Sequence, residues 1–410
     1  MPETFDMISV ASRPEAELES RSSWGDYETA RKGIVRSIHT VVFKSKINLL
    51  LPFGPAAILL HYTTGKHGLV FILSLLGIIP LAERLGYTTE QISFYTGPTV
   101  GGLLNATFGN ATEMIISLFA LKSGMIRVVQ QNLLGSILSN LLSVLGSAFF
   151  IGGVVHHKKL QYFSKADAVV NSGLLLMAVM GLMLPAVLHY SKTEVRIGTS
   201  ELSLSRFSSF VMLLAYGSSL FFQLKSQPEH IPYVVLEEVS FQDDSDEETP
   251  ELTLREAVAW LFTVTLCVSL ISEYLVDAIE GAADDLNVPV AFVSVILLPI
   301  GGNAAAYATC VMCAVKDKLD ITLGVAIGSS TQISMFVIPF YVIVGWLMGQ
   351  PMDLNFQLFE TATLFITVLV VAFLLQEGNS NYFKGVMLML GYFVVAASFF
   401  VHEDPSNRSL

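Results

Sequence analysis

Residues 109–113 read Gly-Asn-Ala-Thr-Glu and residues 302–306 read Gly-Asn-Ala-Ala-Ala, so one short pattern occurs twice in this chain. Each copy lies inside an apolar stretch, and the second begins 193 residues after the first. A Gly-Ser pair follows each copy, 26 residues after its first glycine. The second copy carries Ala306 where the first carries Glu113. Because an ionisable side chain at bilayer depth is costly, Glu113 is a candidate functional residue, and its absence at 306 is the main question.

The composition around these motifs is that of a polytopic membrane protein. Of 410 residues, 52% are hydrophobic and only 14% are charged, which is too apolar for an ordinary soluble domain. Apolar stretches of near membrane-spanning length predict an all-α fold with eleven transmembrane helices. These spans are expected at 46–62, 68–88, 98–122, 127–152, 167–189, 205–224, 257–280, 288–316, 319–347, 354–376 and 382–401.

An acidic segment divides the spans into two groups. Residues 237–256 carry nine acids against one arginine, within a linker expected at 225–256. A leading helix at 46–62 and five spans in residues 68–224 precede this linker, and five spans in residues 257–401 follow it. Because five is odd, equivalent helices of the two groups cross the membrane in opposite directions. This predicts two inverted five-helix repeats with a substrate site near the midplane, where the repeats meet.

The two ends of the chain are expected to be polar tails, residues 1–45 and 402–410. No cleavable signal is evident in the first tail. The positive-inside rule places the N terminus in the cytoplasm, because five basic residues crowd the approach to the first span; these are Arg31, Lys32, Arg36, Lys44 and Lys46. The net charge of −12 and the absence of a basic stripe argue against a nucleic-acid partner.

Amides and hydroxyls share helix faces with Glu113 and with the second motif. The candidate cation- and proton-binding residues are Glu113, Asn110, Asn303, Ser136, Ser139, Ser329 and Gln332. Small and hydroxylated residues also occur simply because they let membrane helices pack closely, and this is the alternative interpretation for most of the small and polar residues on these helix faces. Their oxygen atoms suit Ca²⁺ or Mn²⁺ better than copper or zinc. Since burial favours the neutral form of a carboxyl group, Glu113 can take up a proton when a cation leaves. The residues therefore predict exchange of a metal ion for protons, with Glu113 as the metal-binding carboxylate.

Other chemistry has little support. The three cysteines lie within predicted spans, and the Cys-x-x-Cys at 310–313 lacks the second ligand pair of a zinc site, so we expect all three to be packing residues. The glycine-rich stretch at 324–330 lacks the Gly-Lys-Ser/Thr of a phosphate-binding loop. We expect no cofactor and no enzymatic activity, with Ca²⁺ and protons as the transported ions and the lipid bilayer as the main partner.

Five longer motifs resemble those of the plant vacuolar cation/proton exchangers, over about residues 35–405. They are Gly101-Gly-Leu-Leu-Asn-Ala-Thr-Phe-Gly-Asn-Ala-Thr-Glu113, Leu134-Gly-Ser-Ile-Leu-Ser-Asn140, Tyr274-Leu-Val-Asp-Ala-Ile-Glu280, Gly324-Val-Ala-Ile-Gly-Ser-Ser-Thr-Gln332 and Met352-Asp-Leu-Asn-Phe356. The resemblance implies eleven helices, an acidic linker after the sixth, and proton-driven loading of Ca²⁺, sometimes Mn²⁺ or other divalent metals, into the vacuole. It also implies that the N-terminal tail can be regulatory; a plain disordered tail is the alternative. The acidic linker is either a solvated tether or a weak Ca²⁺-sensing element.

This chain departs from that family at the second motif, which normally continues Gly-Asn-Ala-Ala-Glu-His. Ala306 and Tyr307 stand where that Glu and His would fall. Glu113 alone leaves a bound divalent ion with a net positive charge in a poorly solvated site, which costs on the order of several kcal/mol. Since roughly 1.4 kcal/mol is tenfold in affinity, Ca²⁺ binding is expected to weaken by about two decades or more. Four acids can partly compensate if they face the cavity: Glu83, Asp277, Glu280 and Glu360.

Three functional hypotheses follow. The first is a vacuolar Ca²⁺/proton exchanger whose affinity or stoichiometry is altered. The second is a transport-defective member, either a regulatory partner in a hetero-oligomer or a deliberately substituted form. The third is an exchanger of a different, monovalent cation, for which one carboxylate suffices. The sequence leaves the oligomeric state, homo- or hetero-oligomer, open.

Overall fold

The computed structural model describes residues 35–157, 159–192, 199–226 and 250–402. The chain forms two compact units, residues 1–48 and residues 49–410. In the first unit, a π-helical turn, η1 (His39–Phe43), is followed by Asn48, whose side-chain amide donates to the carbonyl oxygens of Val41 and Val42 at 2.9 Å. Most of the predicted acidic linker, and residues 1–34 of the predicted tail, lie outside the described residues.

The described part of the second unit is almost entirely helical. After a 3₁₀ turn, η2 (Lys46–Leu50), its helices are α2 (Phe53–Thr64), α3 (His67–Phe108), α4 (Ala111–Lys122), α5 (Ile126–Leu138), η3 (Ser139–Val144), α6 (Leu145–Val155), α7 (Lys165–Ser191), α8 (Thr199–Ser226), α10 (Leu254–Asp277), α11 (Ile279–Leu286), α12 (Val290–Phe292), η4 (Val293–Leu297), α13 (Leu298–Gly302), α14 (Ala304–Val315), α15 (Leu319–Gln332), η5 (Ile333–Val337), α16 (Ile338–Met348), α17 (Leu358–Leu375) and α18 (Tyr382–Phe400). Two short strands, β1 (Gln161–Tyr162) and β2 (Asn379–Ser380), pair antiparallel and join the loop after α6 to the loop after α17.

Seven helical segments of the described residues are long and apolar enough to cross a membrane, or up to nine if each bent helix pair is one span. This confirms a helical, polytopic protein. The predicted spans at 167–189 and 257–280 correspond closely to α7 and α10. The predicted span at 127–152 corresponds to the continuous run α5–η3–α6. The total of eleven spans stays a prediction.

Two predicted spans are not single helices, and both break at a motif. The stretch expected at 98–122 does not begin a helix of its own, because α3 runs unbroken from His67, through the span expected at 68–88, to Phe108. It is then interrupted before α4 starts at Ala111. The stretch expected at 288–316 is interrupted at Asn303, between α13 and α14. Asparagine suits such a break because it tolerates non-helical backbone angles and can occupy the position before a helix. Each copy of the motif therefore forms a discontinuity inside an apolar stretch.

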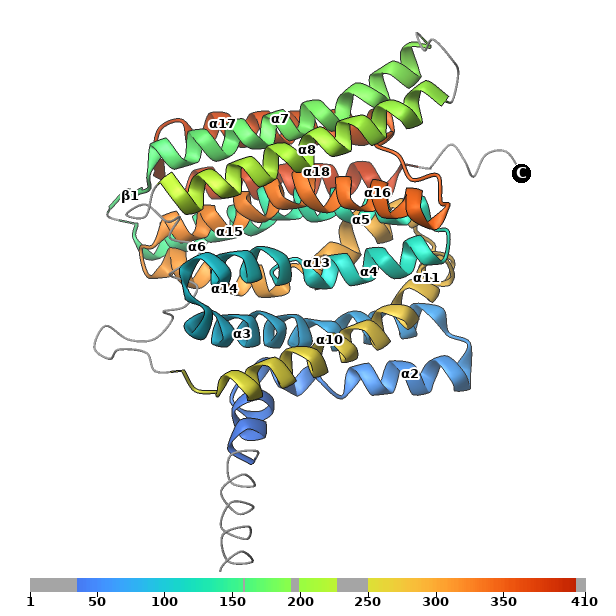
Figure 1. Cartoon of the computed structure of the whole chain (residues 1–410), viewed down its shortest axis with the longest axis vertical. Coiled ribbons are helices and arrows are strands. Elements are labelled where there is room, and N and C mark those ends of the chain that lie inside the picture. Colours follow the sequence, from blue (N-terminus) through green and yellow to red (C-terminus); the bar gives the residue numbers. More distant parts are fainter. Residues whose placement is uncertain (1–34, 158, 193–198, 227–249, 403–410) are drawn as a thin grey trace, which may run out of the picture. The chain divides into compact units, whose positions relative to one another are not determined.

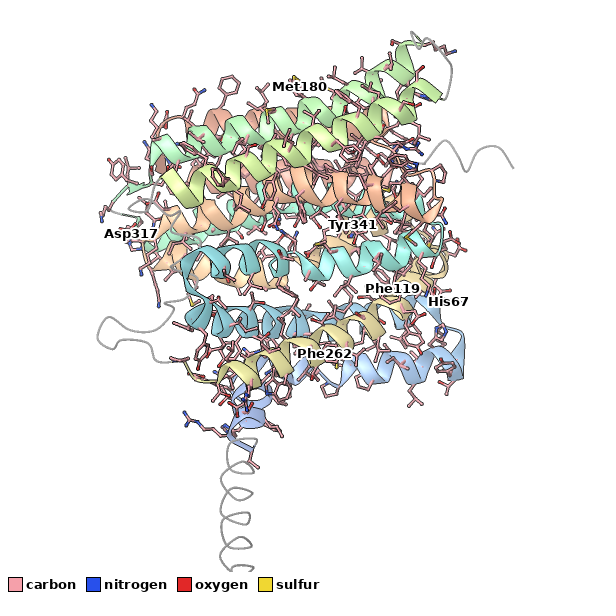
Figure 2. The ribbon with its side chains drawn as sticks, in the orientation of Figure 1. His67, Phe119, Met180, Phe262, Asp317 and Tyr341 are labelled. Carbon is pink, nitrogen blue, oxygen red and sulfur yellow. The ribbon has the colours of Figure 1, made fainter. Side chains whose placement is uncertain are left out.

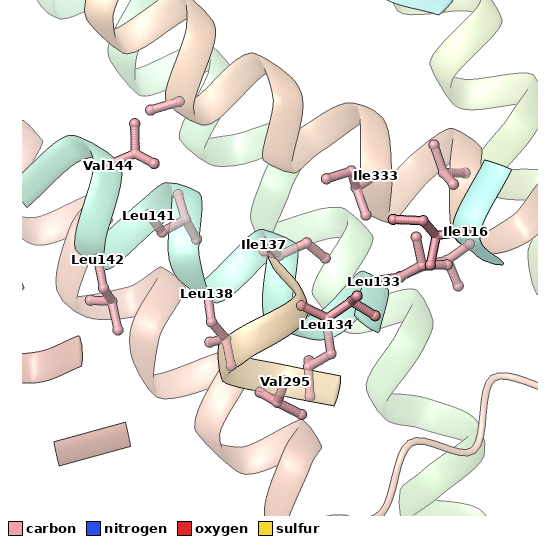
Figure 3. Packing of buried hydrophobic residues seen from close by; sticks show 14 of the residues in the cluster. Ile116, Leu133, Leu134, Ile137, Leu138, Leu141, Leu142, Val144, Val295 and Ile333 are labelled. Carbon is pink, nitrogen blue, oxygen red and sulfur yellow. The ribbon is translucent and has the colours of Figure 1, made fainter. Parts of the chain in front are cut away.

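Helices before and after the acidic linker pack against each other. As Figure 1 shows, α3 lies beside α10, and α2 packs on α3; elsewhere α6 packs on both α14 and α18, and α5 packs on η4. The core between them is apolar: Figure 3 shows Leu133, Leu134 and Ile137 of α5 close to Val295 of η4 and Ile333 of η5. The site is therefore assembled from two parts of the sequence that are far apart.

A glycine allows the close approach of α5 to η4. A Cβ atom on Gly135 of α5 would lie 2.2 Å from the carbonyl oxygen of Val295 in η4, so only glycine fits there without moving backbone. The equivalent glycine of the second half, Gly328 in α15, has no atom within 4 Å of its Cβ position. The two Gly-Ser pairs therefore occupy different surroundings despite their equal spacing in the sequence.

Candidate cation site at the two broken helices

The carboxyl group of Glu113 lies against the second copy of the motif. Glu113 is the third residue of α4, and its side chain is 3% exposed. A Cβ atom at Gly302, the last residue of α13, would come within 2.8 Å of the Glu113 Oε1 atom. The first turn of a helix favours negative charge, because free backbone N–H groups point toward it. The structure thus places an acid of the first half directly against the break in the second half.

The two motif asparagines reach into the opposite halves of the chain. The Asn110 side-chain amide donates to Gln332 Oε1 at 2.7 Å, and the Asn303 amide donates to the backbone carbonyl oxygen of Ser136 at 3.4 Å. Because a backbone carbonyl only accepts, the NH₂ group of Asn303 must face Ser136. Its Oδ1 atom then points elsewhere and is available to a cation. The structure therefore links four of the sequence-predicted residues in two reciprocal pairs.

We call the place where the two broken helices meet, around Glu113 and Gly302, the junction. The face of α5 and η3 beside this junction holds polar groups that lack partners. The Ser136 hydroxyl and both polar side-chain atoms of Asn140 are buried, with no hydrogen-bond partner among the described residues. The Ser139 hydroxyl lies 3.4 Å from the hydroxyl of Tyr307. Buried polar groups are nearly always satisfied in proteins, so unpaired oxygens here are candidates to meet a cation or water. Asn140 belonged to a quoted motif but was left out of the predicted site, because sequence alone does not show that its amide is unpaired.

Ala306 occupies in α14 the position that Glu113 occupies in α4, the third residue after the break. Ala306, Tyr307 and Ser329 are only half-buried. Ala306 and Tyr307 pack against the hydrophobic core, so this chain contributes only a methyl group at the position where the resemblance leads us to expect a second acid.

The four acids that could compensate for the absent carboxylate at 306 are either paired with an arginine or exposed. Glu83 forms an ion pair with the neighbouring Arg84, and Glu360 is fully buried and bonded to Arg127 at 2.6 Å. Asp277 and Glu280 are exposed near the junction of α10 and α11. Within the described ranges no three Asp, Glu, His or Cys side chains gather as a metal site. A cation bound at the junction would therefore rely on Glu113 and neutral oxygens.

The helices around the junction depart from regular α geometry. The π-helical turn η3 begins at Ser139, η5 begins directly after Gln332, and η4 precedes α13. π-helical turns commonly occur at functional sites, since they leave backbone carbonyl groups less regularly bonded. Tyr341 of α16 lies beside α4, as Figure 2 shows, and its hydroxyl donates to the carbonyl oxygen of Met114, the residue after Glu113. This bond ties α4 to α16.

A scan against family models matches residues 66–225 and 256–401 to the sodium/calcium exchanger protein family. The chain belongs to this family. The two matched segments lie on either side of the acidic segment, and each contains one broken helix.

Curated relatives place the chain among the vacuolar cation/proton exchangers of that family. It is 70% identical over 374 residues to vacuolar cation/proton exchanger 3 of Oryza sativa subsp. japonica, covering 91% of this chain and 90% of that protein. It is 66% identical to vacuolar cation/proton exchanger 5 of Arabidopsis thaliana, covering 93% and 87%. The resemblance to plant vacuolar exchangers is thus confirmed, and the chain is a member of a transporter family rather than of an enzyme class.

A solved structure shares the fold. The structure of native YfkE, whose selenium-substituted form is described as a Ca²⁺/H⁺ antiporter protein, matches with a TM-score of 0.72 at 34% identity. The match covers 87% of this chain and all of that one. The helices that carry the broken motifs therefore belong to an architecture already known for a cation/proton exchanger.

Loss of the Gln332 amide should destabilise the junction. In Gln332→Leu, the buried Asn110 amide loses its partner, so we expect the free energy of unfolding to fall by about 1–3 kcal/mol. Thermal unfolding in detergent measures this change. Ser398→Ala is the control and should unfold like the wild type, because this half-buried serine of α18 bonds to the Val394 carbonyl oxygen of its own helix. A Gln332→Leu protein as stable as this control would show that the Asn110 bond contributes nothing.

Proposed function

We propose that this protein is a Ca²⁺/proton antiporter of the vacuolar membrane whose transport is impaired because only one half of its site supplies a carboxylate. The observation that carries the proposal is the placement of Glu113, buried and pressed against Gly302 at the meeting point of the two broken helices. The names of the relatives support the cation/proton exchange and the vacuolar membrane. Mn²⁺ and other hard divalent cations suit the same oxygen ligands.

The architecture we propose is one leading helix and two inverted five-helix repeats, with a cytoplasmic N terminus. Equivalent breaks at Asn110 and Asn303, 193 residues apart, support the repeat. The reciprocal bonds of the two asparagines support a site shared by both halves. Basic residues before the first span support the orientation.

Exchange in this site follows from competition for one carboxylate. A divalent cation binds when Glu113 is ionised, with the Asn303 oxygen and unpaired hydroxyl and amide oxygens completing its shell. When the cation leaves, burial favours protonation of Glu113, and the proton is carried back. With alanine at 306, a bound Ca²⁺ keeps a net positive charge, so binding is weak and fewer protons are exchanged per cycle.

A monovalent cation is a second candidate cargo. The structure provides one negative charge at the junction, since the acids at 83 and 360 are already paired and those at 277 and 280 are exposed. One carboxylate balances one positive charge, so Na⁺ or K⁺ would be neutralised where Ca²⁺ is not.

The test is Ca²⁺ uptake into sealed vesicles driven by an imposed pH gradient. The wild type is compared with Glu113→Gln, which keeps the size of the side chain and removes its charge. Glu377→Gln, at an exposed loop acid paired with Lys384, is the matched control. We expect weak uptake by the wild type and by the control, and none by Glu113→Gln. Equal uptake by the wild type and Glu113→Gln would contradict Ca²⁺ exchange and favour a transport-defective member; uptake of Na⁺ or K⁺ in its place would favour the second cargo.

A further inference from the structure

A polar cavity of about 280 Å³ lies away from the Glu113 junction, where α5 begins and α7 ends. Its lining includes Arg127 and Gln130 of α5, His189 of α7, and Asp353 and Asn355 in the loop between α16 and α17. α5 begins shortly after α4 ends, and in Figure 2 Phe119 of α4 lies at the end of the helices opposite Asp317. The cavity therefore belongs to one end of the bundle and not to its centre.

Asp353 is held firmly in this cavity. Its Oδ1 atom accepts hydrogen bonds from the Gln130 side chain and from the backbone N–H of Asn355, both at 3.0 Å. The next residue, Leu354, donates its backbone N–H to the hydroxyl of Ser205 in α8 at 3.1 Å. The loop is thus fixed to both α5 and α8, and the Asp353 carboxyl group cannot turn freely toward bulk water.

The charges facing Asp353 come from four helices and leave an excess of acid. Glu201 of α8 is 6% exposed and bonds His189 of α7 at 2.7 Å. Arg127 of α5 bonds Glu360 of α17 at 2.6 Å and is thereby neutralised. Burial, and after it the charge of Glu201, raise the pKa of Asp353 to about 6.

Acceptors outnumber donors around this group. The second carboxylate oxygen of Glu201 and the side-chain oxygen of Asn355 are buried and have no partner among the described residues. A protonated Asp353 would bring one additional O–H donor into a cluster that lacks donors. The surroundings therefore favour its neutral form on grounds of hydrogen bonding as well as charge.

Buried side chains connect this cavity with the helix that carries Glu113. Gln131, next to Gln130, donates to Glu360, and the following residue, Asn132, donates to the Ser117 hydroxyl at 3.3 Å. Ser117 lies one turn after Glu113 on α4. The first two turns of α5 thus carry polar side chains that bond to the cavity, to α17 and to α4 in turn.

We propose that Asp353 is a second proton-binding residue, located at one mouth of the transport site, whose protonation state sets the charge that an entering or leaving cation meets. This deepens the proposed function and rests on it. The step is a simple protonation: hydronium in the cavity gives its proton to the Asp353 carboxylate and becomes water. Below about pH 6 the mouth is less negative and releases cations; above it the mouth attracts them.

Infrared difference spectroscopy of the purified protein tests proton binding without any transport. The spectra are recorded at about one pH unit below and above pH 6, in Glu113→Gln protein, so that the junction acid does not contribute. We expect a neutral-carboxyl signal that titrates near pH 6, is lost in Asp353→Asn and persists in Glu377→Gln. Asparagine keeps the oxygen that Gln130 bonds, so the variant should fold, and its melting temperature checks this. A signal that persists in Asp353→Asn would overturn the proposal.

A transport measurement tests the role of that proton. Ala306→Glu protein, in which both halves carry an acid, is compared with the same protein bearing Asp353→Asn, while the pH on the cavity side is varied from about 5 to about 7. We expect Ca²⁺ uptake by the double variant to vary no more than about twofold over this pH range. Its uptake should equal that of the Ala306→Glu protein at low pH, because asparagine mimics the protonated acid. A uniform loss at every pH would show a merely structural role and overturn the proposal. Absence of exchange in all variants would contradict the proposed function instead, and the infrared titration would still decide for or against Asp353.

Discussion

Ala306→Glu will raise the apparent Ca²⁺ affinity of this protein by about a hundredfold in the pH-gradient uptake assay. The substitution places a second carboxylate in the first turn of α14, in the position that Glu113 holds in α4. Two carboxylates balance a divalent ion, which removes an electrostatic cost on the order of several kcal/mol. About 1.4 kcal/mol corresponds to tenfold in affinity, so a hundredfold gain uses only part of that cost. Position 306 is half-buried, so the added carboxyl group is not enclosed on every side.

Two control variants separate charge from size and from location. Ala306→Gln has nearly the same shape without the charge, and it should transport no better than the wild type. Ala305→Glu adds the same charge one residue earlier on α14, where the helix turns the side chain to another face. Equal gains from Ala305→Glu and Ala306→Glu would contradict a site at 306. If Ala306→Glu abolishes the transport seen in the wild type and raises uptake of neither Ca²⁺ nor Mn²⁺, a monovalent cargo would be favoured.

Gly135→Ala will destabilise the protein by about 2–3 kcal/mol, whereas Gly328→Ala will not. An added methyl group at 135 would meet the backbone carbonyl oxygen of Val295 at 2.2 Å, so α5 and η4 must separate. Overpacking of this kind typically costs about 1–3 kcal/mol, and backbone cannot move aside as a flexible side chain does. At 328 the methyl group meets nothing within 4 Å. There alanine should be neutral or stabilising by up to about 1 kcal/mol through its higher helix propensity.

The two glycine variants form a matched pair, since the same substitution is made in equivalent Gly-Ser pairs. Thermal unfolding in detergent measures the difference, and Ca²⁺ uptake shows whether the separation of α5 from η4 also disturbs the site. Equal melting temperatures would contradict the close contact at Val295. Equal losses of stability in Gly135→Ala and Gly328→Ala would indicate that the two glycines are equally tightly packed.

Much of the site was accessible from sequence because its motifs are local and repeated. The apolar stretches predicted a membrane protein, and the recurrence of Gly-Asn-Ala singled out Asn110 and Asn303, at which the structure then showed the two breaks. The same comparison singled out Glu113 and exposed the missing acid at 306. Sequence did not predict the breaks themselves, because a hydropathy window averages over the two or three residues at which a helix is interrupted.

Other features depended on which helices meet. The possible compensating role of Glu360 could not be judged until its bond to Arg127 was seen, 233 residues apart in the chain. Asn140 and Asp353 both lie in motifs that the sequence displayed, yet nothing in the motifs shows that the Asn140 amide is unpaired or that Asp353 is half-buried near the charge of Glu201.

The sequence by itself determined that this is a helical membrane protein in which one short motif occurs twice, with an acid at 113 and none at 306. It did so because hydrophobic length and short motifs are properties of neighbouring residues. Only the tertiary structure decided that the Glu113 carboxyl group rests against Gly302, that the two asparagines bond across the halves, and that Gly135 and Gly328 have unlike surroundings. Those facts depend on contacts between residues 160 to 222 positions apart in the chain. Such contacts are set by the fit of whole helix surfaces rather than by any local pattern.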